Sequence, residues 1–167
     1  MHGEDLAMLR GWIDAIRRNH ALEHATVAVL LARHGPMRLA GRASADGFLL
    51  YGALDPEEVL SAANEALQRL QGGQPELAVS PLCGTNIAVA GMLAAATAII
   101  ALTAGSRRGR LPNAFIASMF AVIAAQPVGR AVQQHLTTCA DLEGVAVVGV
   151  RDIVGELRKV QTSGAQR

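Results

Sequence analysis

The sequence contains few aromatic residues and almost no net charge. Aromatic residues make up 3% of the 167 positions and apolar residues 51%, which points to alanine- and valine-rich helices rather than a large aromatic core. The formal net charge is +1, so no overall field attracts nucleic acid or acidic substrates, and we expect no nucleic-acid partner. The length is that of one domain, or of a small domain with a membrane element.

Cysteine is also scarce. Cys83 and Cys139 are the only two cysteines, and they form neither a disulfide framework nor a complete zinc-finger set. The N-terminal residues contain no uninterrupted apolar segment and no small-residue cleavage site, so the sequence predicts no signal peptide.

Two long stretches lack charge. Residues 87–104 form 18 positions without a charged side chain, and residues 114–129 are almost as apolar. Each stretch is close to the ~20 residues that a helix needs to cross a bilayer. The sequence therefore predicts a transmembrane helical hairpin in the cell membrane, with the lipid bilayer as a partner. The alternative is a buried helical hairpin in a soluble protein, which the alanine content and the pair Gln126-Pro127 favour.

Two features of this hairpin concern its orientation and its association. Arg107, Arg108 and Arg110 in the connecting segment favour a cytoplasmic turn. The missing signal peptide and the arginines of the N-terminal part favour cytoplasmic soluble segments instead, and we expect this second arrangement. Gly91 and Ala95 are four positions apart, a small-residue spacing that lets helices approach closely and would permit a homodimer.

The segments around the hairpin alternate between helical and extended patterns. Apolar residues recur every three or four positions from Leu6 onward, which predicts a long helix within residues 5–34. A second helix is expected between Asp55 and the glycines at 72 and 73. Short extended runs predict strands at 37–42, 47–52, 76–80 and 144–150, with a turn at Asp46-Gly47 in the first pair and a polar tail after the last strand.

These patterns predict an α+β fold with a two-helix transmembrane hairpin. Residues 1–85 are expected to form a soluble helix–hairpin–helix–strand part, and residues 86–130 the transmembrane hairpin. Residues 131–167 supply a last strand and tail that complete the soluble part. A small mixed sheet and its helices would then lie on one face of the membrane.

The stretch HALEH (20–24) places His20, Glu23 and His24 inside an apolar helical run. On a helix the two histidines are one turn apart, so their imidazoles can bind one metal ion, and zinc is the ion we expect. Glu23 is close enough to act as the catalytic general base, because zinc lowers the pKa of a bound water to about 7 and a nearby carboxylate accepts its proton. The alternatives are a structural polar cluster and ordinary surface residues.

The H-x-x-E-H spacing resembles that of the inverzincin metallopeptidases, but the resemblance covers only these five residues. The length and the domain duplication of that family are missing here. The resemblance implies a glutamate from a downstream helix as a third ligand, and Glu57, Glu58 and Glu65 are the helical candidates.

Other possible ligands flank the hairpin. Cys83 lies in the turn PLCGTN before the first apolar stretch, and His135 follows the second in QQHLTT. Because the ends of an antiparallel hairpin meet at one membrane face, the helix that carries His20 could dock there. The candidate metal ligands are then His20, His24, Cys83 and His135, with Cys139 a weaker candidate. A lone cysteine can instead be a small buried apolar residue, and a histidine at a helix end can favour the helix dipole.

Four sequence blocks resemble an uncharacterised family of small bacterial membrane proteins, found in cyanobacteria and related phyla. The blocks are RNHALEHAT, GRASADGFLLYG, EALQRLQGGQPELAVSPLCGTN and QQHLTT, and the similarity covers about residues 17–150. Proteins of this family carry a domain of unknown function. The resemblance implies that the five candidate site residues, His20, Glu23, His24, Cys83 and His135, lie in its recognisable blocks.

Two hypotheses of function follow. The first is a zinc-dependent membrane hydrolase of peptidase type, acting on an unidentified protein or peptide. In it His20 and His24 bind zinc, Glu23 is the general base, and Cys83 or His135 completes the metal shell. The second is a non-enzymatic membrane scaffold or assembly factor with structural histidines or a structural metal. A closed four-ligand shell would favour the second hypothesis, because catalysis needs an open position on the metal.

Overall fold

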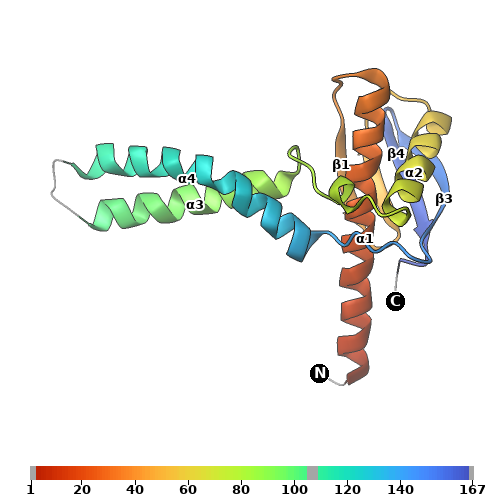
Figure 1. The fold of residues 1–167 in the computed structure, drawn as a ribbon, viewed down its shortest axis with the longest axis horizontal. Coiled ribbons are helices and arrows are strands. Elements are labelled where there is room, and N and C mark those ends of the chain that lie inside the picture. Colours follow the sequence, from red (N-terminus) through yellow and green to blue (C-terminus); the bar gives the residue numbers. More distant parts are fainter. Residues whose placement is uncertain (1–2, 105–108, 166–167) are drawn as a thin grey trace. The chain divides into compact units, whose positions relative to one another are not determined.

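The structure is a computed structural model that describes residues 3–104 and 109–165. Within these residues it contains four α-helices and a four-stranded antiparallel sheet, which confirms the predicted α+β class (Figure 1). Arg107 and Arg108 of the predicted loop lie outside the described residues. The chain forms two compact units. The sheet unit consists of Met1–Ser80 and Gln134–Arg167, and the hairpin unit of Pro81–Gln133.

The sheet unit is assembled from both ends of the chain. Its first part comprises α1 (Gly3–His34), β1 (Ala40–Ser44), β2 (Gly47–Tyr51), α2 (Pro56–Gln71) and the short 3₁₀ helix η1 (Pro75–Ala78). The hairpin unit contains α3 (Gly84–Thr103) and α4 (Arg110–Val132). The π-helical turn η2 (Gln133–Thr137) follows, and β3 (Ala146–Val154) and β4 (Leu157–Ser163) complete the sheet.

Helix α1 has two halves with different surroundings. Acidic residues in its first turn and basic residues in its last turn complement the helix dipole. Residues 4–10 are exposed, whereas residues 19–26 are buried except for the half-buried His20. The predicted candidate site therefore lies where α1 packs into the sheet unit.

The sheet has the strand order β1-β2-β4-β3, and each neighbouring pair is antiparallel. The predicted mixed sheet is therefore wrong. The reason is that the expected polar tail folds back as β4 and enters the centre of the sheet through a tight turn at Gly155 and Glu156. Gly155 has a φ of +55°, which favours glycine in this turn. The predicted hairpin around Asp46-Gly47 is confirmed.

The strand predicted at 76–80 is wrong, because this segment begins as a 3₁₀ helix. η1 starts with Pro75, whose ring fixes φ near the helical value. Ala78 at its end is buried in the core of the sheet unit. The carbonyl of Ala78 faces α1 and is a hydrogen-bond partner of His24 rather than of a neighbouring strand.

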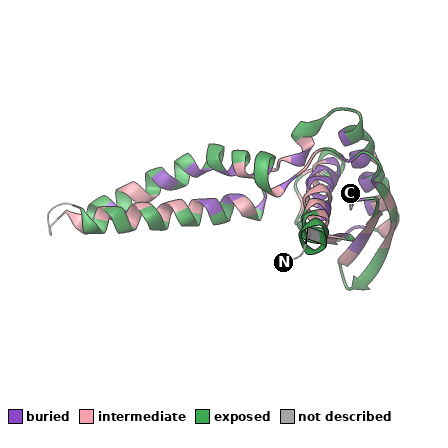
Figure 2. Ribbon diagram, turned by 90° about the horizontal axis from the view of Figure 1, so that it is seen from below, coloured by how far each residue is buried: buried purple, intermediate pink, exposed green. Residues whose placement is uncertain are grey.

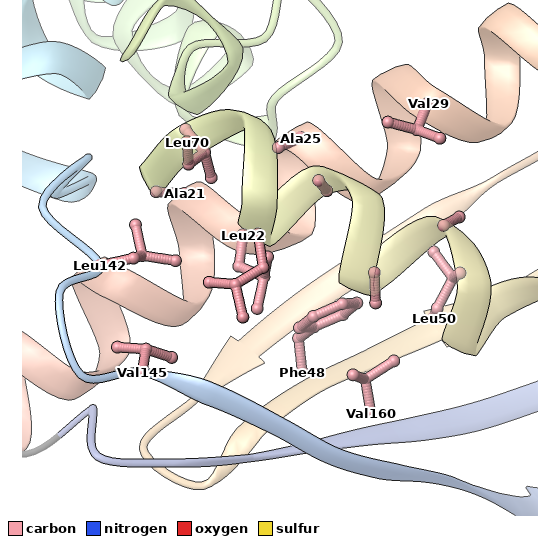
Figure 3. Close-up of a cluster of buried hydrophobic side chains, with 14 of the residues drawn as sticks. Ala21, Leu22, Ala25, Val29, Phe48, Leu50, Leu70, Leu142, Val145 and Val160 are labelled. Atoms are coloured by element: carbon pink, nitrogen blue, oxygen red, sulfur yellow. The ribbon is translucent and has the colours of Figure 1, made fainter. Parts of the chain in front are cut away.

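The core of the sheet unit lies between one face of the sheet and helices α1 and α2 (Figure 3). Phe48 of β2 is fully buried and is the register partner of Val160 on β4. Both side chains point toward Leu22 of α1 (Figure 3). Full burial of a Phe side chain contributes about 1.5–3 kcal/mol. The apolar periodicity of the two helices thus buries one face of each against the sheet.

The helices of the hairpin unit are long and apolar enough to cross a membrane. α3 has 20 residues, and the continuous helical stretch Arg110–Thr137 has 28. Of the most apolar 18 residues of each stretch, only 11% and 17% are buried, and most of both helices is exposed or intermediate (Figure 2). Most of the apolar surface of these two stretches is therefore left uncovered by the described residues.

Helices α3 and α4 approach closely at one glycine. A Cβ on Gly129 of α4 would overlap the amide oxygen of Asn86 on α3. That oxygen accepts a hydrogen bond from the buried Gln133 over 2.8 Å, and the Asn86 amide nitrogen donates to the carbonyl of Pro81. Gly91, in contrast, has open space where its side chain would be, so its small-residue spacing does not form this contact.

Candidate metal site on helix α1

His20 and His24 lie on the same face of α1, and their rings are in contact. The ring centroids are 4.3 Å apart, and the rings meet edge to face at 61°. His24 is 4% exposed and His20 is half-buried. A nitrogen of the His20 ring lies within 4.8 Å of a nitrogen of the His24 ring. The two imidazoles predicted to share an ion are therefore brought together.

Each histidine is held through the same ring nitrogen. Nδ1 of His24 lies 2.8 Å from the carbonyl oxygen of Ala78, and Nδ1 of His20 lies 3.0 Å from that of Thr137. A carbonyl oxygen can only accept a hydrogen bond, so Nδ1 carries the hydrogen in both rings. In the neutral imidazole, Nε2 is then the unprotonated nitrogen. Metal-binding histidines are commonly oriented in this way by a backbone carbonyl.

Glu23 is buried on the neighbouring face of the same helix. It is 7% exposed, and its carboxylate lies against Gly41 of β1, where a Cβ would overlap it. Gly41 is the register partner of Leu50, so this position faces the core side of the sheet. Residues three apart on a helix are neighbours. Glu23 therefore adjoins His20 while the missing side chain of Gly41 leaves room for its carboxylate.

The turn that orients His20 is fixed to α1 by Arg17. The guanidinium of Arg17 donates to the carbonyls of His135 and Thr138 over 3.2 and 3.3 Å, and the carbonyl of Arg17 accepts from the amide of Cys139 over 3.0 Å. The Thr137 hydroxyl oxygen is buried and has no hydrogen-bond partner among the described residues. A buried polar group without a partner next to the imidazole pair is unusual and points to a further ligand or water.

The remaining candidates belong to other segments of the chain. The His135 side chain is exposed, although its backbone carbonyl is bound by Arg17. Cys83 belongs to the hairpin unit and caps the N-terminus of α3, where its sulfur accepts a hydrogen bond from the amide of Thr85. Cys139 has a free, half-buried thiol. Metal ligation by Cys83 and by His135 stays a prediction.

The helical glutamates of α2 form ion pairs near the C-terminal end of α1. Glu58 pairs with His34, and Glu65 pairs with Arg33 and Arg69. The hydrogen bond from Arg33 holds the pKa of Glu65 below its ordinary value. These interactions tie the end of α1 to α2, several helical turns away from His20 and His24.

Sequence patterns gave no indication of Arg17, Thr137 or Gly41. Arg17 and its carbonyl partners are 118 and 121 positions apart in the sequence. Arg17 binds backbone carbonyls, Thr137 acts through its own carbonyl and Gly41 through an absent side chain, and such roles leave no local motif. The juxtaposition arises only when the chain after the hairpin returns to α1.

Fold and site together define a class: a small α+β protein with a helical hairpin of membrane-spanning length and a pair of oriented histidines on its first helix. The chain matches the family described as "Domain of unknown function (DUF6391)" over residues 15–150 and belongs to it. This confirms the predicted membership of an uncharacterised family. The chain is also similar to an uncharacterized protein of Picosynechococcus sp., with 34% identity over 144 residues that cover 76% of this chain and 67% of the relative. No solved structure matches the chain.

Proposed function

We propose that this chain is a membrane-anchored zinc-binding protein whose first two metal ligands are Nε2 of His20 and of His24. One observation carries the proposal: both rings present Nδ1 to a backbone carbonyl, which leaves both Nε2 atoms as electron-pair donors. Zinc binds histidine nitrogens at about 2.0–2.1 Å, so two ligands of one tetrahedral ion are roughly 3.3 Å apart. The ring centroids of His20 and His24 are 4.3 Å apart, so both rings lie within reach of one ion.

The proposal needs at least one further ligand, and Cys83 is our first candidate. His24 is hydrogen-bonded to Ala78, and the five residues from Ala78 to Cys83 span at most about 18 Å. Chain connectivity therefore permits the thiol to reach His24. A helix N-terminus favours negative charge, which suits a metal-binding thiolate at the cap of α3. His135 is the second candidate, two residues before the carbonyl that orients His20.

The membrane part of the proposal is that α3 and α4 cross the cell membrane as a hairpin and that the sheet unit lies in the cytoplasm. Large apolar side chains on both helices support it, since Ile87 is 76% and Phe115 is 68% exposed. Contiguous apolar surface of this kind is rare on soluble monomers. Lipid chains would cover it without any change in the hairpin.

Zinc content tests the metal site. Elemental analysis of the detergent-purified chain is expected to find about one zinc per chain. His20→Ala and His24→Ala are each expected to lose it, because two remaining ligands cannot hold the ion. His34→Ala is the matched control: His34 lies on the same helix but pairs with Glu58, and this variant should keep its zinc. A well-folded wild type without metal, or zinc retained in both variants, would overturn the proposal.

Cobalt substitution identifies the further ligand. A thiolate bound to Co²⁺ gives a near-ultraviolet charge-transfer band that imidazole and carboxylate ligands do not give. Cys83→Ser should abolish this band, whereas Cys139→Ser should leave it unchanged. If no such band exists and His135→Ala releases the metal, His135 is the ligand instead.

We propose further that Glu23 acts as a general base, which would make the protein a hydrolase of peptidase type. The burial of its carboxylate, three residues along the helix from His20, supports this role, since a fixed base needs no reorganisation during the reaction. Glu23→Gln should keep the zinc and abolish hydrolysis of a peptide mixture. Gly41→Ala should displace the carboxylate and reduce hydrolysis, while Gly149→Ala, whose Cβ would meet open space, should not.

A structural metal in a non-enzymatic scaffold is the second candidate function. The nearly complete burial of His24 and Glu23 favours it, because a closed site leaves little access for a substrate. In that case no peptide is hydrolysed, and zinc removal lowers the melting temperature of the wild type. Zinc stoichiometry is the same for both candidates, so activity and stability separate them.

A further inference from the structure

The first half of α1 carries an apolar stripe that the sheet unit does not cover. Met8 is 76%, Leu9 46%, Trp12 52% and Ile13 43% exposed. At 100° per residue these side chains and Leu6 fall within about 160° of the helix circumference. This half of α1 extends beyond the sheet in Figure 1. The stripe is therefore an amphipathic helix face exposed within its own unit.

Positive charge adjoins this stripe. Arg10 borders it on the helix, and Arg42 of β1 lines a cavity of about 530 Å³ together with Trp12 and Leu49. Both arginines are exposed, and neither forms an ion pair with any residue that the structure describes. Lys159 also lines this cavity, but it is bound to Asp46. An apolar face beside two unpaired guanidinium groups complements a surface that offers acyl chains and phosphate groups.

A second copy of the chain fits this surface less well than lipid does. Stable protein–protein interfaces use about 20–30 residues a side. The stripe has five apolar residues on one helix. In contrast, amphipathic helices with tryptophan and leucine on one face and arginine at its border bind in the interfacial layer of membranes, burying about 5–10 Å of that face.

We propose that the apolar stripe of α1, Leu6 to Ile13, lies in the interfacial layer of the membrane with Arg10 and Arg42 on the headgroups of anionic phospholipid. This inference rests on the proposed membrane hairpin, because the hairpin keeps the sheet unit near the bilayer. Arginine side chains near the surface are attracted to an anionic leaflet. The stripe would act as a second contact between the sheet unit and the membrane.

Trp12 is the only tryptophan of the sequence, so tryptophan fluorescence reports on the apolar stripe alone. The full chain is reconstituted into vesicles of phosphatidylcholine and phosphatidylglycerol whose acyl chains carry bromine just below the headgroups. Bromine quenches tryptophan only on close approach, so we expect emission to fall roughly twofold relative to unbrominated vesicles. Bromine placed near the ends of the acyl chains should quench less, because the helix lies at the interface.

Charge variants test the arginine contacts. Arg10→Glu combined with Arg42→Glu should reduce quenching in vesicles that contain phosphatidylglycerol, while Arg151→Glu on β3 should not change it. Unquenched Trp12 emission in the wild type would overturn the inference: red emission would mean exposure to water, and blue emission that depends on protein density would mean contact with a second copy. Failure of the chain to float with vesicles would instead overturn the proposed hairpin, and the inference with it.

Discussion

The two units place the same kinds of apolar side chain in opposite environments. In the sheet unit, Phe48 and Leu22 are fully buried between helices and sheet. In the hairpin unit, Phe115, Phe120 and Ile123 of α4 are each more than 65% exposed. The buried side chains of the sheet unit are removed from water by the fold itself. In the hairpin unit the fold leaves the largest apolar side chains exposed.

The buried polar groups differ as well. In the sheet unit, Asn19 is fully buried, donates to the carbonyls of Ser44 and Ala45, and accepts from the Thr162 hydroxyl. In the hairpin unit, Gln133 donates to Asn86 at one end, and the Ser118 hydroxyl donates to the carbonyl of Ala94 near the middle. Satisfied polar groups specify how the elements of the sheet unit fit together. In a helical hairpin the backbone hydrogen bonds lie within each helix, which is the arrangement that a membrane-spanning segment needs.

Removal of one phenylalanine from each unit is expected to have the largest effect and tests this difference directly. Phe48→Ala leaves a cavity in a packed core and should lower the free energy of unfolding by about 3–5 kcal/mol. Phe115→Ala, the same chemical change on an exposed face, should alter it by less than about 1 kcal/mol. Amide hydrogen exchange of β2 and β4 in the full chain measures the stability of the sheet unit. Equal losses of unfolding free energy in both variants would contradict the difference in side-chain packing between the two units.

A smaller effect is expected at the glycine contact of the hairpin. Gly129→Ala forces its new methyl group against Asn86 and should destabilise the packing of α3 and α4 by about 1–3 kcal/mol. Gly91→Ala places the same methyl group in open space, where the higher helix propensity of alanine should be neutral or slightly stabilising. The difference is measured in mixed micelles with distance labels on the two helices. The labels report the loss of helix–helix contact as denaturant is added. Tolerance of alanine at 129 would mean that Asn86 can move away.

Sequence periodicity predicted most of the fold because each helix and the first hairpin have local causes. The charge-free stretches, the Asp46-Gly47 turn and the three- and four-residue spacing in α1 each depend on residues close in the chain. β4 was missed because its polar residues are satisfied by distant partners. Arg158 donates to the carbonyl of Gly52, and Lys159 donates to Ser44. Gly155 followed by one polar residue was the signal that could have indicated the turn.

The candidate site was predictable only in part. The spacing of His20 and His24 follows from helix geometry, and their contact is as expected. Their orientation depends on the carbonyls of Ala78 and Thr137, which lie 54 and 117 positions away. A backbone carbonyl is present at every residue, so its identity cannot be read from a side-chain pattern. The tautomer that supports metal binding is thus a property of the fold.

The smallest predicted effect concerns an ion pair at the edge of the sheet unit. Lys159, whose side chain is 9% exposed, donates to Asp46 over 2.7 Å and to the Ser44 hydroxyl over 2.6 Å. The hydrogen bond from Lys159, together with that from Ser44, lowers the pKa of Asp46 below its ordinary value of 3.8. Because the folded-state pKa is depressed, the ionised carboxylate stabilises the fold above pH 3.8, and this contribution is lost as the pH falls through the lower folded-state value.

Asp46→Asn tests the direction of this pH dependence. The Asp46 side chain is 67% exposed, so water screens the pair and the expected loss near neutral pH is about 0.5–1 kcal/mol. The difference in unfolding free energy between wild type and Asp46→Asn should shrink as the pH falls below 3.8 and approach zero below the lower folded-state pKa, where the wild-type carboxyl group is protonated in the folded state too. Urea unfolding of the full chain at a series of pH values measures it, and Asp152→Asn, which removes a longer ion pair of 3.5 Å with Arg158 on the same sheet, is the comparison. A difference that stays constant at low pH would mean that Asp46 contributes through packing rather than through its charge.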